Sequence, residues 1–145
     1  MDRGLAVILT AAVGGLIAMQ PAINSGLSRE TGSLPAALVS FIVGTIALAV
    51  IVGLSGQLGN VRFAFDAAPV YLLGGLLGAL YVTMALIAVR EIGAGGVAAA
   101  TITGQLTFSL IIDRLGILGL RETEITVDRL LGVALLLAGT WLIVR

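Results

Sequence analysis

The chain has 145 residues, of which 59% are hydrophobic and 11% are charged, and its formal net charge is zero. A soluble domain is about 45–50% apolar and about 25% charged, so too few polar side chains remain here to cover a water-facing surface. The absence of Cys, His and Lys excludes disulfides, thiol chemistry and a His-ligated metal, and without a basic run nucleic acid is not an expected partner. We therefore expect an integral membrane protein that lies in a lipid bilayer and uses no metal or cofactor.

The apolar runs are continuous and are separated by Gly, Pro and charged residues. This pattern predicts an all-α membrane protein, because a transmembrane barrel needs alternating inward and outward residues. Five runs are long enough to cross a bilayer, at about residues 4–27, 34–54, 68–89, 94–113 and 127–144. We treat residues 1–145 as a single five-helix transmembrane domain, and five spans place the two termini on opposite sides of the membrane.

The first run is too long for a cleaved signal peptide, and Asp2 and Arg3 give almost no positive region before it. Pro21 has no amide hydrogen and crowds the carbonyl one turn earlier, so we expect a kink there. Gln20 and Asn24 flank this proline. Their amides either line a water-filled cavity beside exposed backbone carbonyls or hydrogen-bond neighbouring helices.

The second run, 34–54, is nearly all aliphatic, which is typical of a lipid-facing helix. Residues 28–32 before it read as a short polar turn, with Ser33 as the helix cap. Residues 55–66 after it are rich in Gly, Gln and Asn, which predicts a loop. Asp66 is the expected cap of the third run.

The third run carries Gly74 and Gly78 at a four-residue spacing that indicates close helix packing in a membrane. Tyr81 lies deeper in the run, so its hydroxyl needs either an interhelical partner or a cavity. Thr83 follows on the same helix. We include Tyr81 and Thr83 among the candidate substrate-binding residues.

The fourth run combines two stripes on one predicted helix. Gly96, Ala100 and Gly104 share a face at four-residue spacing, and small residues let two backbones approach closely in lipid. The neighbouring stripe is polar and consists of Thr101, Gln105 and Ser109. We expect the first stripe to pack against another helix and the second to bind substrate.

Asp113 directly continues the fourth run and is followed by Arg114. An ionisable group within a membrane is a functional candidate, and a partly buried Asp113 would bind a proton or a cationic substrate. The alternative is that Asp113 lies at the surface, where it pairs with Arg114 or Arg121 and holds the loop. The last run then begins at Thr126 and Asp128, with the carboxylate complementing the helix dipole.

Arginine placement indicates how the chain inserts. Five arginines fall on the side of the N-terminus and three on the other side, which weakly favours a cytoplasmic N-terminus. So weak a bias is compatible with insertion in both orientations. Many carriers consist of two inverted repeats that meet at a midplane site, and a five-span chain would supply one of them. We expect an antiparallel homodimer with dual topology, or a heterodimer with a paralogue in a fixed orientation; a parallel assembly or a monomer is the remaining alternative.

Two segments carry a resemblance that covers nearly the whole chain. Residues 71–83 (Tyr-Leu-Leu-Gly-Gly-Leu-Leu-Gly-Ala-Leu-Tyr-Val-Thr) and 104–116 (Gly-Gln-Leu-Thr-Phe-Ser-Leu-Ile-Ile-Asp-Arg-Leu-Gly), together with Gln20 and Asn24, resemble the YdcZ-type family of small bacterial membrane proteins. That family belongs to the drug/metabolite transporter (DMT) superfamily. The resemblance implies a bacterial inner-membrane protein that forms half of a ten-helix inverted-repeat assembly and moves drugs or metabolites.

The leading functional hypothesis is a carrier that exports small metabolites or amphipathic, drug-like compounds by alternating access at a dimer midplane. The polar residues named above from the first, third and fourth helices would line its cavity. One alternative is a passive dual-topology channel lined by the polar stripe. Another is a membrane subunit that binds another complex without transport. We do not expect an enzyme, because no nucleophile–base pair or carboxylate pair is placed deep in the runs.

Overall fold

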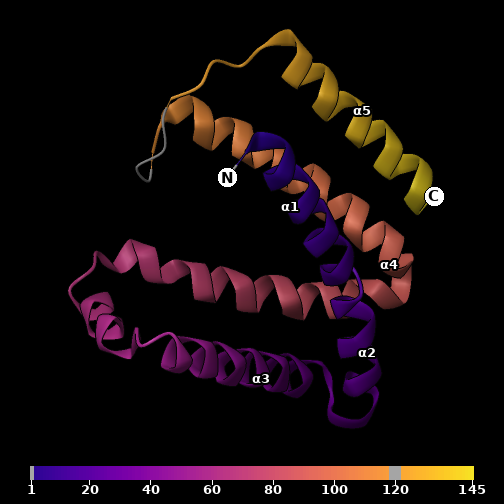
Figure 1. Cartoon of the computed structure of the whole chain (residues 1–145). Coiled ribbons are helices and arrows are strands. Elements are labelled where there is room, and N and C mark those ends of the chain that lie inside the picture. Colours follow the sequence, from indigo (N-terminus) through magenta and orange to yellow (C-terminus); the bar gives the residue numbers. More distant parts are fainter. Residues whose placement is uncertain (1, 118–121) are drawn as a thin grey trace. The chain divides into compact units, whose positions relative to one another are not determined.

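The computed structural model describes residues 2–117 and 122–145, and its regular elements are all helical within these ranges. The α-helices are α1 (Arg3–Ile17), α2 (Gln20–Thr31), α3 (Ser33–Leu54), α4 (Leu73–Leu115) and α5 (Val127–Val144), shown in Figure 1. Four helical stretches in the described ranges are long and apolar enough to cross a membrane: Arg3–Thr31, Ser33–Leu54, Pro69–Leu115 and Val127–Val144. The all-α membrane architecture predicted from the sequence is confirmed.

Helix α4 contains two potential spans rather than one. Gly93 interrupts it with φ 69° and ψ 171°, a conformation that glycine adopts without a side-chain clash. Each part of α4 on either side of Gly93 has about 20 residues and is about 30 Å long, enough to cross the hydrocarbon core. If the two parts of α4 are counted separately, the described helices provide five potential membrane spans.

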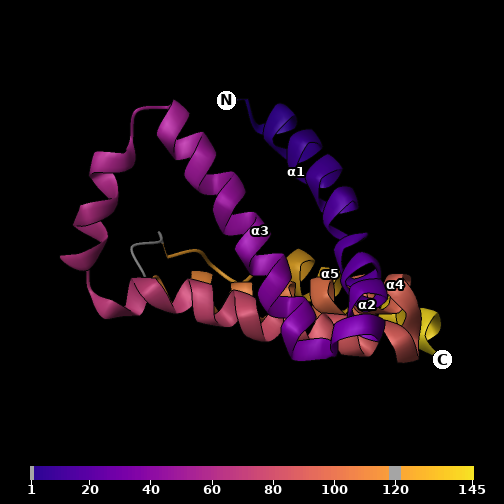
Figure 2. The same ribbon diagram turned by 90° about the horizontal axis from the view of Figure 1, so that it is seen from below.

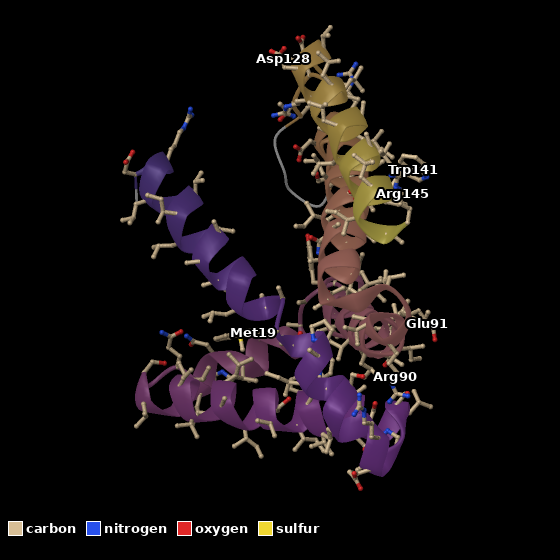
Figure 3. The ribbon with its side chains drawn as sticks, turned by 90° about the vertical axis from the view of Figure 1, so that its right-hand side faces the viewer. Met19, Arg90, Glu91, Asp128, Trp141 and Arg145 are labelled. Atoms are coloured by element: carbon tan, nitrogen blue, oxygen red, sulfur yellow. The ribbon has the colours of Figure 1, made fainter. Side chains whose placement is uncertain are left out.

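The first span is broken where Pro21 predicts a kink. Helix α1 ends at Ile17 and α2 begins at Gln20, with Met19 at the break, as Figure 3 shows. Helix α2 then continues to Thr31, so the predicted polar turn over residues 28–32 is wrong except at Gly32, which has φ 88°. The turn needs only this one residue, because a left-handed glycine is sufficient to end a helix.

Three local predictions between the spans are wrong. Ser33 lies inside α3 and its side chain forms no cap; Gly32 occupies the capping position. Residues Leu58–Phe65 form a 3-10 helix (η1) where we predicted a loop. Asp66 is the C-cap of η1 and not the N-cap of the third run, because Ala68 precedes a second 3-10 helix, η2 (Pro69–Leu72), which leads into α4. Short backbone bonds, such as Asn60 N to Gln57 O at 2.9 Å, replace the expected side-chain caps.

The chain divides into two compact units, Met1–Arg90 and Glu91–Arg145, which we describe separately. The core of the first unit consists of Ala37 on α3 with Val82 and Leu86 on α4, and Phe41 and Tyr81 pack against it. Figure 2 shows that α3 lies against the first part of α4 near the start of α3, and that the two helices separate towards η1 and η2. The core of the first unit is therefore small.

In the second unit, α5 packs along the part of α4 that follows Gly93 (Figure 1). Helix α5 starts as predicted, because Thr126 occupies the N-cap and accepts a hydrogen bond from the amide of Arg129 at 3.4 Å. At the other end of α5, the Arg145 guanidinium lies over the Trp141 ring, 5.0 Å from its centroid (Figure 3). The expectation of one transmembrane domain stays a prediction.

Candidate functional site

An open groove of about 350 Å³ lies between the broken first span and α3 in the first unit. Its lining is mostly aliphatic and includes three polar residues, which are Gln20 and Asn24 on α2 and Ser40 on α3. The structure thus brings Gln20 and Asn24, two of the predicted substrate-binding residues, into one concave surface. The apolar part of the lining consists of Leu16, Ile23, Leu27, Val39 and Val43.

Asn24 is the unusual residue of this groove. It is only 6% exposed, and its Nδ2 has no hydrogen-bond partner among the described residues. A buried amide without a partner costs about 1–3 kcal/mol, so nearly all such groups in folded proteins are paired with protein or water. The described part of the single chain therefore leaves this amide without the partner that a buried amide needs.

A second polar cluster adjoins the groove along α2. Ser25 and Ser28 are buried, at 7% and 5% exposed, and Ser28 Oγ donates to the carbonyl of Ser25 at 2.9 Å. Arg90 of α4 reaches both hydroxyls: its Nε donates to Ser25 Oγ at 3.2 Å, and its Nη2 donates to Ser28 Oγ. Figure 3 shows Arg90 beside α2. We did not predict this cluster, although Ser28 follows Asn24 by four residues and so shares its helix face.

The other two candidates in the first unit lie on α4, and only Thr83 forms a side-chain hydrogen bond within the described residues. Tyr81 is partly buried and packs on the core of α3 and α4. Thr83 Oγ1 donates to the carbonyl of Ala79, one turn earlier in α4, at 2.8 Å. This bond uses the hydroxyl hydrogen of Thr83 and leaves its oxygen available as an acceptor.

The polar stripe of the fourth run lies in the second unit. Gln105 is exposed and forms no hydrogen bond within the described ranges, Thr101 is partly buried, and Ser109 Oγ donates to the carbonyl of Leu106 at 2.9 Å. The threonine that sequence reasoning missed is Thr103, which is 6% exposed. Its hydroxyl oxygen lies 2.7 Å from that of Thr140 on α5. The Thr140 hydroxyl also lies 3.1 Å from the carbonyl of Ala99, to which it donates.

Asp113 pairs with Arg129 in the first turn of α5, at 3.6 Å between Oδ2 and Nη1. The predicted partner Arg114 instead pairs with Glu122, and Arg121 lies outside the described residues. The expectation of an Asp113–Arg114 pair is wrong, because helix geometry directs adjacent side chains about 100° apart. Both side chains of the Asp113–Arg129 pair are more than one-third exposed, which fits a role in holding the loop before α5.

The predicted packing glycines fall into two groups. A Cβ on Gly78 would lie 3.4 Å from the Phe41 ring of α3, and one on Gly96 would lie 3.0 Å from the Ile92 side chain. A Cβ on Gly74 or Gly104 would meet nothing within 4 Å of the described structure. Gly78 therefore permits the close contact of α4 with α3, whereas Ala100 and Gly104 lie on an exposed part of α4.

Comparison with known proteins places the chain in a family. No curated protein and no solved structure matches it. Residues 5–142 match the family DMT_YdcZ, whose description reads "Putative inner membrane exporter, YdcZ". This match covers the groove, the cluster of Ser25, Ser28 and Arg90, and the α4–α5 contact. The chain, with its apolar helices and its match over residues 5–142, belongs to the YdcZ family of inner-membrane exporters.

Proposed function

We propose that this exporter works by alternating access as an antiparallel dimer, and that the groove between α2 and α3 binds its substrate. The observation that carries the proposal is the buried, unpartnered amide of Asn24 in that groove. The substrates that fit are small metabolites or amphipathic, drug-like molecules, because the lining is mostly apolar with a few polar groups.

The break between α1 and α2 supports a transport role. Discontinuous helices in secondary transporters place backbone groups and polar side chains near the bilayer midplane, where substrate binds. The break at Met19 lies well inside the 29-residue stretch Arg3–Thr31, and Gln20 follows it directly. A substrate in the groove would contact the first turns of α2 at this interruption.

The five potential spans support the dimer. One such chain equals one repeat of an inverted-repeat carrier, so a second copy in the opposite orientation would complete it. The exposed small residues Ala100 and Gly104 offer a close-packing face to that copy. A paralogue in a fixed, opposite orientation would meet the same requirement as a heterodimer partner.

The transport mechanism is tested by flux in proteoliposomes. Purified protein is reconstituted, and efflux of a panel of metabolites and amphipathic compounds is measured with and without the same compound on the opposite side. An alternating-access carrier gives saturable flux that a trans substrate accelerates. Flux that is linear in concentration and indifferent to trans substrate would contradict the carrier and indicate a channel.

The antiparallel assembly is tested by the accessibility of single cysteines placed in the turn at Gly32 and in η1. In intact cells, an impermeant thiol reagent should label a fraction of each site, because both orientations coexist. Complete labelling of one site and none of the other would contradict the homodimer and leave the paralogue model.

A further inference from the structure

We propose that the ligand of the groove is an amphipathic anion, whose carboxylate or phosphate group binds Arg90 while its apolar part lies between α2 and α3. This inference rests on the proposed function, because it names the chemistry of the substrate at the proposed site. It is carried by the arrangement of charge and hydrogen-bond donors around α2.

The Arg90 guanidinium has neutral partners only. Its hydrogen bonds within the described residues go to the hydroxyls of Ser25 and Ser28. The ion pairs of the described ranges are Arg114–Glu122 and Arg129–Asp113, and neither involves Arg90. Arginine has five N–H donors, so three remain after these two bonds. The positive charge and the three free donors together suit a planar carboxylate or a phosphate.

Helix α2 connects this charge to the groove. Gln20, Asn24 and Ser28 recur every four residues and share one face of the helix. Asn24 lines the groove, and Ser28, about 6 Å further along the helix axis, contacts Arg90. Ser28 and Arg90 do not line the groove, so a ligand that reaches the guanidinium would extend about one helical turn beyond Asn24 along α2.

Most of the free hydrogen-bonding atoms at this end of the groove are donors, and the exception is the acceptor Oδ1 of Asn24. Asn24 Nδ2 is buried without a partner, and the remaining Arg90 groups are all N–H. The Ser28 hydroxyl already donates to Ser25 O and accepts from Arg90. Donors of this kind satisfy an anionic acceptor, whereas a cationic amphiphile would bring its charge towards Arg90 and be repelled.

Two sources would supply the same chemistry. A free amphipathic acid or alkyl phosphate would be transported, whereas the phosphate of an anionic phospholipid would occupy the site as a resident lipid. The binding of a phosphate or carboxylate next to an alkyl chain is common to both, and the experiment below separates them.

The test compares matched alkyl chains with different head groups. Purified protein in a neutral detergent is titrated with dodecyl phosphate, dodecanol and dodecyltrimethylammonium, and its unfolding temperature is recorded. We expect dodecyl phosphate to raise the unfolding temperature in a saturable way, and the alcohol and the cation to have little effect. Equal stabilisation by all three head groups would overturn the proposal, and this series needs no substitution.

Variants locate the effect at Arg90. Arg90→Gln should weaken the apparent affinity for dodecyl phosphate about tenfold or more, as expected for a lost charge-assisted hydrogen bond. Arg90→Lys should retain part of the head-group preference because it keeps the charge. Arg62→Gln is the control, because Arg62 is exposed on η1, where it lies over the Phe63 ring. Unchanged binding by Arg90→Gln would overturn the proposal.

Experiments in liposomes then distinguish a transported anion from a resident lipid, and they test the anion site separately from the carrier function. If the anion is a substrate, dodecyl phosphate efflux from phosphatidylcholine liposomes depends on Arg90. If it is a resident lipid, phosphatidylglycerol stabilises the wild type more than Arg90→Gln, and no efflux of the alkyl phosphate follows. Arg90-dependent binding without flux of any compound would contradict the carrier but support the anion site. Flux of neutral or cationic compounds without anion binding would support the carrier but contradict the anion site.

Discussion

Two regions bury polar side chains among apolar helices, and they differ in whether those side chains have hydrogen-bond partners. In the second unit, the Thr103 and Thr140 hydroxyls lie 2.7 Å apart, and Thr140 also bonds to the backbone of α4. In the first unit, α2 buries Asn24, Ser25 and Ser28, yet Asn24 Nδ2 lacks a partner within the described chain. A satisfied polar contact stabilises a helix pair, whereas an unsatisfied one costs stability and needs another reason to be there.

The difference suggests different roles for the α2 face and the α4–α5 contact. The α4–α5 contact is a structural hydrogen bond of the kind found between membrane helices. The α2 face has a groove, a helix break and a cation with neutral partners, which are features of a binding site. Substitutions on the α2 face should therefore change transport more than stability, and those at the α4–α5 contact should change stability more than transport.

The largest expected effect on transport comes from Asn24→Leu. Removal of the amide should lower substrate flux at least about tenfold, the loss expected for one charged or well-placed hydrogen bond. The unfolding temperature should stay the same or rise, because an unpaired buried amide has gone. Flux and thermal unfolding of the same preparation measure both. Asn60→Leu on η1 is the matched control, since Asn60 is exposed.

A large stability effect is expected from Gly78→Leu. The new side chain would push against the Phe41 ring, and overpacking of this kind costs about 1–3 kcal/mol. Gly74→Leu on the same helix is the control, because a Cβ there meets nothing within 4 Å. Denaturant unfolding in detergent should separate the two variants; equal stability would show that α4 does not pack on α3 as described.

Thr103→Val and Thr140→Val test the structural side of the comparison. Each should lower stability, and a double-mutant cycle should give a coupling of about 0.6 kcal/mol, with about 1.7 kcal/mol as the upper end for membrane helices. Flux per folded protein should not change. A loss of flux at full stability would place this pair in the transport machinery and remove the contrast between the two units.

The smallest effect is expected from Asp113→Asn. The pair with Arg129 is more than one-third exposed, so its loss should cost less than about 1 kcal/mol. Flux and its dependence on a pH gradient should be retained if the pair only holds the loop before α5. Abolition of gradient-driven flux in this variant would support instead the alternative that Asp113 carries a proton.

The sequence predicts features that depend on local chemistry. The apolar runs predict helices long enough to cross a membrane, Pro21 predicts the break before α2, and Thr126 predicts the start of α5. These signals lie within a few residues of their effects. The Gly93 interruption coincides with the gap that we predicted between the third and fourth runs.

Contacts between helices were not predictable in the same way. Asp113 has three arginines near it in sequence, and its choice of Arg129 depends on how α5 is set against α4. The Thr103–Thr140 and Arg90–Ser25 pairs join residues far apart in the chain, so their register is decided by packing and not by periodicity. Whether Thr101, Gln105 and Ser109 bind substrate stays a prediction.

The most direct test of the groove is photolabelling with a diazirine-bearing alkyl chain of a compound that the protein transports. After irradiation in proteoliposomes, peptide mapping locates the adducts, and excess unlabelled compound serves as competitor. We expect competitor-sensitive adducts within residues 16–27 and 39–43, the two segments that contain the groove lining, and we expect these adducts to be lost in Asn24→Leu. Adducts spread evenly over the lipid-facing helices and insensitive to competitor would contradict this expectation.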